Sequence, residues 1–276
     1  MNGIFIQFYK HKEMVNRVIE GLLQTIDRDK NIIIAIDNLS PNSDSIRKDL
    51  KEHYSKGNID KCYFMKGNYI FNSMREVVKD VLSKTKLDYV VISDGDVIPP
   101  NLGECWTKRF ETYFDEHKDL GGMGFSTDLH HQTKEELKEN AYNYDRVCRP
   151  SNLRCIKGTV PYYLQSGLHF SEKYNKIDED VIESLPMFQY YMIKENIISS
   201  YLQKEPTKTL GDGHISKFIL KNKCRVFRYE STPAKNMTYD SKLLLKDGYS
   251  EYKQERTEIL SSFHKFQKVE GWELLE

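Results

Sequence analysis

Short apolar runs alternate with amphipathic stretches along the first hundred residues of the chain. Runs rich in β-branched residues predict buried strands, and apolar residues spaced three or four apart predict helices. We therefore expect strands at 4–8, 32–36, 62–65 and in the run that leads into Asp94, and helices at 14–23, 43–54 and 70–82. This alternation predicts an α/β fold with a mostly parallel central sheet flanked by helices.

The pattern is looser after Pro100. A capping box at Thr133–Glu136 predicts the start of a helix that continues to Tyr144. The last 40 residues are highly charged with scattered apolar residues, which predicts one or two C-terminal helices packed on the outside. The other expected elements are strands at 121–126, 160–165 and 225–229 and helices at 187–202 and 216–220.

Two carboxylates, Asp94 and Asp96, follow the fourth strand, and Pro99-Pro100 comes after Val97 and Ile98. Acidic groups at the end of a buried strand are unfavourable unless something compensates their charge. A divalent cation carrying a diphosphate would do so, because carboxylates are hard oxygen ligands and leave coordination positions for phosphate and water. The alternative is an acidic turn, since Asp and Gly favour turn geometry.

Polar residues also follow the other strands predicted in this half: Gln7 and Tyr9 after the first, Asp37 and Asn38 after the second, and Asn68 after the third. Ligands of parallel α/β sheets bind at the carboxyl ends of the strands. We therefore expect these side chains to share one site with Asp94 and Asp96.

Charge and composition exclude several classes of protein. The 276 residues include 41 Lys and Arg and 41 Asp and Glu, so the balance does not favour a nucleic-acid binder. Five cysteines without a Cys-x-x-Cys pair argue against a disulfide framework or a zinc site. No signal peptide is recognisable, and no run approaches the roughly 20 apolar residues of a membrane span. We expect a cytoplasmic protein without a transmembrane segment, and leave open peripheral contact with the inner face of the membrane.

The order of these strand-end residues resembles the nucleotide-sugar half of GT-A-fold (Rossmann-like) glycosyltransferases, most closely glycosyltransferase family 2. In that family the second strand ends in Asp-Asp-Gly-Ser-x-Asp, and Asp37-Asn38-Leu39-Ser40 with Asp44 is a loose version in which Asn38 replaces the second acid. The Ala-Arg-Asn element of the family is matched by Arg75 alone, since Glu76 stands in the Asn place.

Three later segments extend the resemblance. Residues 165–170 are similar to the glycine-containing segment that lines the acceptor side, which implies roles for Gly167 and His169. Residues 209–215 resemble the Glu-Asp element that supplies the catalytic base, with Asp212 matching the Asp and Gly211 replacing the Glu. Many relatives place a metal- or phosphate-binding His after the next strand, but residues 231–236 contain none, and Lys235 could replace it as a phosphate contact.

The resemblance implies a metal-dependent glycosyltransferase of the inverting kind, in which Asp212 would deprotonate the acceptor hydroxyl. Mn²⁺ or Mg²⁺ would be bound by Asp96, with Asp94 at the ribose or the metal and His214 as a further candidate ligand. The partners would be a nucleotide-sugar and a glycan, lipid-linked or other hydroxyl acceptor, in surface polysaccharide or glycoconjugate synthesis. The implied donor-binding residues are Gln7, Tyr9, Asp37, Asn38, Arg75, Asp94 and Gly95.

The same resemblance divides the chain into a nucleotide-sugar half at residues 1–103, an acceptor and catalytic half at 104–235, and a helical extension at 236–276. It leaves a retaining mechanism open, because retaining GT-A enzymes carry the same metal motif.

Simpler interpretations of single residues remain. Asp212 could cap a helix, Arg75 could belong to a solvated helix face, and His169 could be structural. His130 and His131 are adjacent, so on a strand their side chains would point to opposite faces and would not share a metal.

Two other functions also remain. One is a sugar nucleotidyltransferase, although the segment after the first strand lacks the glycine-rich phosphate loop usual in that class. The other is a non-catalytic nucleotide- or glycan-binding module with the same fold.

Overall fold

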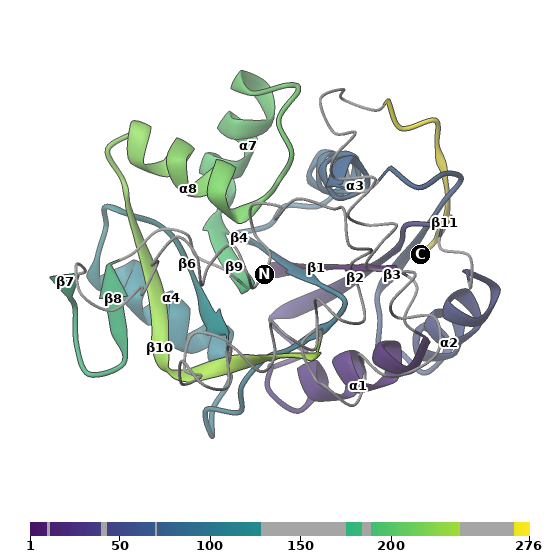
Figure 1. Ribbon diagram of the computed structural model, residues 1–276, viewed down its shortest axis with the longest axis horizontal. Helices are drawn as coiled ribbons and strands as arrows, with labels where there is room; N and C mark the ends of the chain where they lie inside the picture. Colours follow the sequence, from purple (N-terminus) through teal and green to yellow (C-terminus); the bar gives the residue numbers. More distant parts are fainter. Residues whose placement is uncertain (10–11, 40–42, 70, 128–174, 184–188, 238–267) are drawn as a thin grey trace, which may run out of the picture.

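The computed structural model describes residues 1–9, 12–39, 43–69, 71–127, 175–183, 189–237 and 268–276 (Figure 1). Within these residues the strands form one mixed sheet in the order β11-β3-β2-β1-β4-β9-β6-β10-β8-β7, with β5 paired to β10 off this path. The strand predicted at 160–165 and the helix predicted at 135–144 lie outside the described residues.

The first half of the chain forms the elements that its apolar pattern predicts. Strands β1, β2, β3 and β4 are parallel neighbours, because the chain returns through a helix after each of the first three. The elements are β1 (Asn2–Phe8), α1 (Lys12–Leu23), β2 (Asn31–Asp37), α2 (Ser43–Ser55), β3 (Lys61–Met65), α3 (Phe71–Lys84) and β4 (Tyr89–Asp94).

The second half extends the same sheet beyond β4. Strand β9 is antiparallel to both β4 and β6, whereas β10 is parallel to β6, so β6 and β10 run in the direction of β4. The elements are β5 (Val97–Ile98), α4 (Trp106–Glu116), β6 (Leu120–Thr127), β7 (Asn175–Lys176), β8 (Val181–Glu183), β9 (Gln189–Lys194), α7 (Glu195–Lys204), α8 (Asp212–Lys221), β10 (Arg225–Asn236) and β11 (Trp272–Leu275).

Two apolar layers cover the faces of the sheet. One layer contains α1, α2 and α4, and the other contains α3, α7 and α8; Figure 1 shows α1 and α2 opposite the other group. Side chains of β4 alternate between the layers, with Val91 in the first and Val90 and Ile92 in the second. Because both faces are buried, the interior of each central strand is apolar and polar residues are confined to the strand ends.

The prediction of a helix at 187–202 is wrong in its first part, because residues 189–194 form strand β9 and the helix begins at Glu195. Tyr190 and Met192 pack in one layer while Tyr191 and Ile193 pack in the other. A strand buried on both faces is apolar throughout, and such a run does not show by periodicity alone whether it is strand or helix.

The described end of the chain also differs from the predicted C-terminal helices. Residues 272–275 form β11, which pairs antiparallel with β3 at the edge of the sheet. Trp272 contacts Tyr63 edge-on at 5.8 Å between ring centroids, and Glu276 forms a 2.5 Å ion pair with Lys61. Helix α4 was also missing from the predicted elements.

No helix in the described part of the chain has the length and apolar character that crossing a bilayer requires.

Candidate functional site

The ends of three parallel strands place the predicted site residues side by side. In the pairing of β1 with β2, Phe8 lies opposite Asp37, and in the pairing of β1 with β4, Gln7 lies opposite Asp94. All three strands run in the same direction, so these residues line the carboxyl edge of the sheet. This is the edge at which parallel α/β sheets bind ligands.

The Asp94-Gly95-Asp96 segment packs tightly against the end of β1. The Gly95 amide donates to the Gln7 carbonyl at 2.8 Å. A Cβ atom at position 95 would lie 2.5 Å from Phe8 Cδ1 and 2.7 Å from the Gln7 carbonyl oxygen. Glycine is therefore required here by close approach of the backbone, and it lets the two carboxylates flank a backbone held against β1.

Neighbouring strands hold both acids. Gln189 Nε2, at the start of β9, donates to Asp94 Oδ2 at 3.3 Å. On the other side the Met237 amide donates to the Asp96 carbonyl at 2.9 Å, where the end of β10 turns to pair with β5. The segment is therefore fixed by contacts with β1, β9 and β10, which come from both halves of the chain.

Tyr190 adds strain and a buried polar group beneath the motif. It has a positive φ of 45° and lies at the bulge between β9 and β6. Bulges re-aim neighbouring side chains, which accounts for the direction of Gln189 toward Asp94. The fully buried Tyr190 hydroxyl donates to the Val97 carbonyl at 2.9 Å; burial and the nearby Asp96 and Asp94 raise its pKa.

The donor atoms at this edge fit a hard divalent cation that also binds phosphate. Asp94 and Asp96 are both partly exposed, and their carboxylates are the oxygen ligands that Mg²⁺ and Mn²⁺ prefer. Across the described residues, no group of three or more His, Cys, Asp or Glu side chains could hold a metal ion. Two protein carboxylates with phosphate oxygens in the remaining positions is the arrangement these residues allow.

Asp37 and Asn38 form the second part of the edge. The wholly buried Asp37 carboxylate accepts from Arg47 Nε at 2.6 Å, and Arg47 also donates to the Met65 carbonyl at 2.7 Å. The Asn38 amide donates to Asn68 Oδ1 at 2.9 Å and accepts from the Tyr69 backbone amide at 3.1 Å. The ends of β2 and β3 are thereby tied together by side chains.

Gln7 and Tyr9 are half-buried at the end of β1. Gln7 Oε1 accepts from the Ser73 hydroxyl of α3 at 2.9 Å, and Tyr9 packs against the core layer of α1. Both residues lie at the predicted edge, and their contact with a donor stays a prediction.

Arg75 makes its hydrogen bonds away from these strand ends. It is completely buried, so the solvated-face interpretation is wrong. Its Nη1 and Nη2 atoms donate to the backbone carbonyls of Lys208 at 2.8 Å and Leu202 at 2.5 Å. The guanidinium predicted to bind the donor is thus engaged with the end of α7 and with the segment that follows it, and donor contact stays a prediction.

Asp212 is the first residue of α8 and follows Gly211, the N-cap, whose backbone is extended. Helix α8 leads into Arg225, which pairs with the first residue of β6 at the opposite edge. The start of α8 is therefore directed toward the carboxyl edge. His214 keeps much of its surface exposed, and its Nδ1 lies 3.1 Å from Thr209 Oγ1. Desolvation of the shielded part of the ring, and then the nearby Lys208, lower its pKa.

The last candidate residues are Lys235, Gly167, His169 and the adjacent pair His130 and His131. Lys235 is exposed and pairs with Ile98 beside the acidic motif. Gly167, His169, His130 and His131 lie outside the described residues.

Three residues at this edge were missed by sequence reasoning. Arg47 lies on a polar helix that showed no sign of reaching a buried acid, and Gln189 and Tyr190 were assigned to a helix. The aromatic and β-branched character of residues 190–193 was the one available signal for a strand.

Neither a protein-family model nor a curated protein sequence matches the chain. Among solved structures, a fragment of S. aureus TarS in complex with UDP matches with a TM-score of 0.52 and 11% identity, covering 95% of this chain and 72% of that one. A longer S. aureus TarS structure matches at 0.53 and 11%, covering 95% of this chain and 42% of that one. The mannosyltransferase PcManGT from Pyrobaculum calidifontis, in complex with GDP-Man and Mn²⁺, matches at 0.51 and 12%, covering 97% of this chain and 65% of that one.

These matches confirm the predicted fold class. The chain has an α/β fold of the GT-A glycosyltransferase type, with a large mixed central sheet flanked by helices. It spans less than two thirds of the longer TarS chain and of PcManGT. At 11–12% identity the similarity concerns the fold, and the activity has to be argued from the site.

Proposed function

We propose that the chain is a metal-dependent glycosyltransferase that moves a sugar from a nucleotide-diphosphate donor to a hydroxyl acceptor with inversion. The observation that carries this proposal is the acidic motif, Asp94-Gly95-Asp96, held at the carboxyl edge of the sheet between β1, β9 and the end of β10. An acidic surface turn would not need this packing. The proposal extends to surface polysaccharide or glycoconjugate synthesis at the cytoplasmic side.

Each residue has a chemical task in this proposal. Asp96, with Asp94, would hold Mn²⁺ or Mg²⁺, which as a Lewis acid offsets the negative charge on the departing diphosphate. Gln7 and Asn38 would contact the nucleotide beside the motif through their amide groups. The structural relatives crystallised with UDP and with GDP-Man and Mn²⁺ make UDP- and GDP-sugars the first donors to test.

Asp212 would act as the general base. The acceptor oxygen forms a bond to the anomeric carbon while the bond from that carbon to the diphosphate oxygen breaks, and the acceptor proton passes to the Asp212 carboxylate. General-base catalysis of this kind contributes on the order of 10²–10⁴-fold. The position that supports this role is the start of α8, directed toward the edge that carries Asp94.

The test has a binding arm and a turnover arm. Calorimetry with Mn²⁺ and either UDP or GDP identifies the base, and a panel of nucleotide-sugars assayed for nucleoside diphosphate release, with and without EDTA, identifies the donor. Asp96→Asn should abolish metal-dependent binding and release, whereas Asp212→Asn should retain binding and lose transfer. Asp115→Asn, which alters an exposed carboxylate on α4, is the matched control and should change neither.

Other results favour the other functions. Pyrophosphate release from a nucleoside triphosphate and a sugar phosphate would favour a nucleotidyltransferase. Nucleotide binding without release or transfer from any donor would favour a binding module. Release that is unchanged by Asp96→Asn would remove the acidic motif from the mechanism.

A further inference from the structure

The segment between α7 and α8 is held by side chains from three other places in the fold. The carbonyls of Lys208, Thr209 and Leu210 each accept a hydrogen bond, from Arg75 Nη1, the Tyr201 hydroxyl and the Tyr191 hydroxyl respectively. Those donors belong to α3, α7 and β9. Three consecutive carbonyls bound in this way fix the path of the backbone, because each bond restrains one peptide plane.

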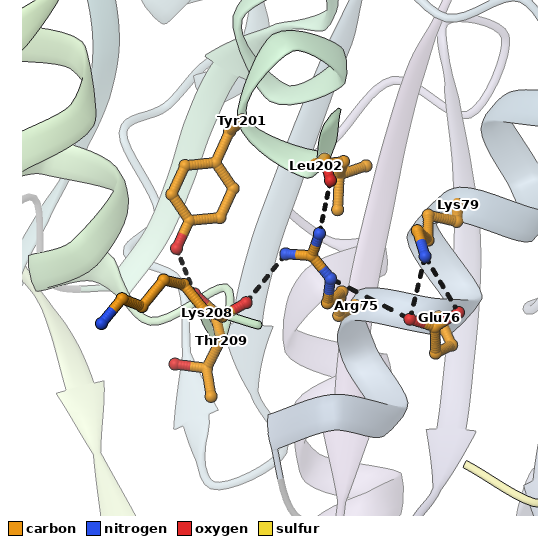
Figure 2. Close-up of polar contacts among 7 residues, drawn as sticks. All are labelled: Arg75, Glu76, Lys79, Tyr201, Leu202, Lys208 and Thr209. Atoms are coloured by element: carbon orange, nitrogen blue, oxygen red, sulfur yellow. Dashed lines mark hydrogen bonds and ion pairs between the residues drawn. The ribbon is translucent and has the colours of Figure 1, made fainter. Parts of the chain in front are cut away.

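Arg75 also binds the C-terminal end of α7. Its Nη2 atom donates to the carbonyl of Leu202, one of the last four helix residues, whose carbonyls have no partner within the helix (Figure 2). A cation at this end is favoured by the helix dipole. One planar guanidinium therefore joins the end of α7 to Lys208, six residues further along the chain.

The burial of Arg75 shows that this contact is built into the core. Its side chain has no exposed surface, and among the residues that the structure describes its ion-pair partner is Glu76, with the carboxylate 3.9 Å from Nε. The guanidinium carbon lies 6.0 Å from the centre of the Tyr201 ring. A buried charge is retained only where hydrogen bonds offset its desolvation, and two of those bonds go to backbone carbonyls on either side of this connection.

The two tyrosines attach the same segment to the layers next to it. Tyr201 donates to the Thr209 carbonyl at 2.6 Å (Figure 2). Tyr191 lies opposite Ile92 in the pairing of β9 with β4, and its hydroxyl donates to the Leu210 carbonyl. Leu210 is therefore tied to the strand adjacent to the one that ends in Asp94.

Only Gly211 separates this restrained segment from the first residue of α8. The Gly211 carbonyl accepts from the amides of His214 at 3.0 Å and Ile215 at 3.1 Å, which closes the first turn. The backbone at Asp212 is consequently placed by contacts that reach β9, α3 and α7.

We propose that Arg75, Tyr201 and Tyr191 are positioning residues that set where α8 begins and hence where Asp212 stands relative to the carboxyl edge. This inference rests on the proposed function, since it takes Asp212 as the base. Loss of any one of the three bonds leaves the donor side intact and misplaces the base, and small misplacements of reacting groups lower turnover far more than binding.

Three conservative variants test the proposal. Arg75→Lys keeps the charge but not the fork of two donors, and Tyr201→Phe and Tyr191→Phe each remove one hydroxyl. Tyr113→Phe is the matched control, because it removes a tyrosine bond to Asp178 on the other side of the sheet. Hydrogen exchange of peptides covering residues 205–216, calorimetry with Mn²⁺ and UDP or GDP, and kcat with the donor that the wild type accepts are measured for each.

The expected result is a split between binding and turnover. Exchange at 205–216 should accelerate about 10-fold in each of the three variants, the effect of one lost hydrogen bond. Their kcat should fall by about 10-fold or more while the nucleotide Kd stays within about 2-fold of wild type. Tyr113→Phe should leave all three measurements unchanged.

Two results would overturn the positioning role. The first is unchanged exchange at 205–216 in Tyr201→Phe and Arg75→Lys. The second is a loss of nucleotide affinity in Arg75→Lys as large as its loss of kcat, which would make Arg75 a donor contact. The exchange measurement needs no substrate, so absence of any transferase activity in the wild type would defeat the proposed function while exchange still decides whether these residues hold the segment.

Discussion

The ends of the parallel strands and the start of α8 face the same edge of the sheet, but different interactions hold them. At the strand ends the backbone is packed so closely that a Cβ on Gly95 would lie 2.5 Å from Phe8. At the start of α8 a Cβ on Gly213 would meet no atom within 4 Å, and the preceding segment is held by side-chain hydrogen bonds to its carbonyls. The strand ends should therefore respond to added volume, and the start of α8 to lost hydrogen bonds.

Gly95→Ala should have the largest effect of the substitutions that compare the two regions. The added methyl group meets Phe8 and the Gln7 backbone, and overpacking of this kind typically costs about 1–3 kcal/mol, so we expect a value near the upper end. The shift of the motif should also lower turnover by on the order of 10²-fold. Urea unfolding and the nucleoside diphosphate release assay measure the two effects. A fully stable, fully active Gly95→Ala protein would mean that the edge is not packed as described.

Arg47→Met should have the next largest effect, because Asp37 is completely buried and its ion pair with Arg47 is 2.6 Å long. Removing one partner of a buried pair costs about 3–5 kcal/mol, and we expect about 2 kcal/mol because the Arg47 side chain is 24% exposed. Urea unfolding checks this value. Lys48→Met, an exposed change on the same helix, should have little effect, and Asp37→Asn should recover part of the loss in the double variant.

The two regions also differ in how far the sequence predicts them. Residues 4–8, 32–36 and the acids after β4 follow from local patterns, because an apolar run in a parallel sheet must end where polar side chains begin. The carboxyl edge could therefore be predicted from the order of strand-end residues alone.

The surroundings of α8 could not be predicted in the same way. Arg75 lies 127 residues before Leu202 and 133 before Lys208, and nothing near Arg75 in the sequence marks those carbonyls as its partners. The strand β9 looked helical because both of its faces are buried. Contacts of backbone carbonyls leave no pattern of residue types, which is why the edge was found and the support of α8 was not.

A buried histidine on α2 should make the stability of the protein depend on pH. His53 is 6% exposed, and burial is the main reason why its pKa is lowered from its ordinary value of 6.5. Its Nε2 lies 2.8 Å from Asn16 Oδ1 and its Nδ1 lies 3.0 Å from Asn58 Nδ2, so the neutral ring joins α1 to the end of α2.

The sign of the effect follows from proton binding. Below pH 6.5 the unfolded chain takes up a proton at His53 before the folded protein does, so the contribution of this group is full above 6.5 and is lost as pH falls toward its folded pKa. Urea unfolding as a function of pH should show this slope in wild type and a weaker one in His53→Gln. His214→Gln should weaken the slope in the same direction, because the pKa of His214 is lowered as well. Equal slopes in wild type and His53→Gln would contradict the assignment.

Gly213→Ala should have the smallest effect and the opposite sign. Position 213 is the second residue of α8 and has open space around it, so alanine keeps the helical backbone and restricts the unfolded chain. We expect stability to rise by about 0.5 kcal/mol, toward the low end of glycine-to-alanine changes in helices. Gly57→Ala is the matched control, because its surroundings are equally open but its φ is +71°, and it should destabilise the protein. If Gly213→Ala and Gly57→Ala changed the free energy of unfolding in the same direction, backbone conformation would not be what separates them. If Gly213→Ala destabilised the protein as much as Gly95→Ala, the start of α8 would be as closely packed as the strand ends, and the contrast between the two regions would fail.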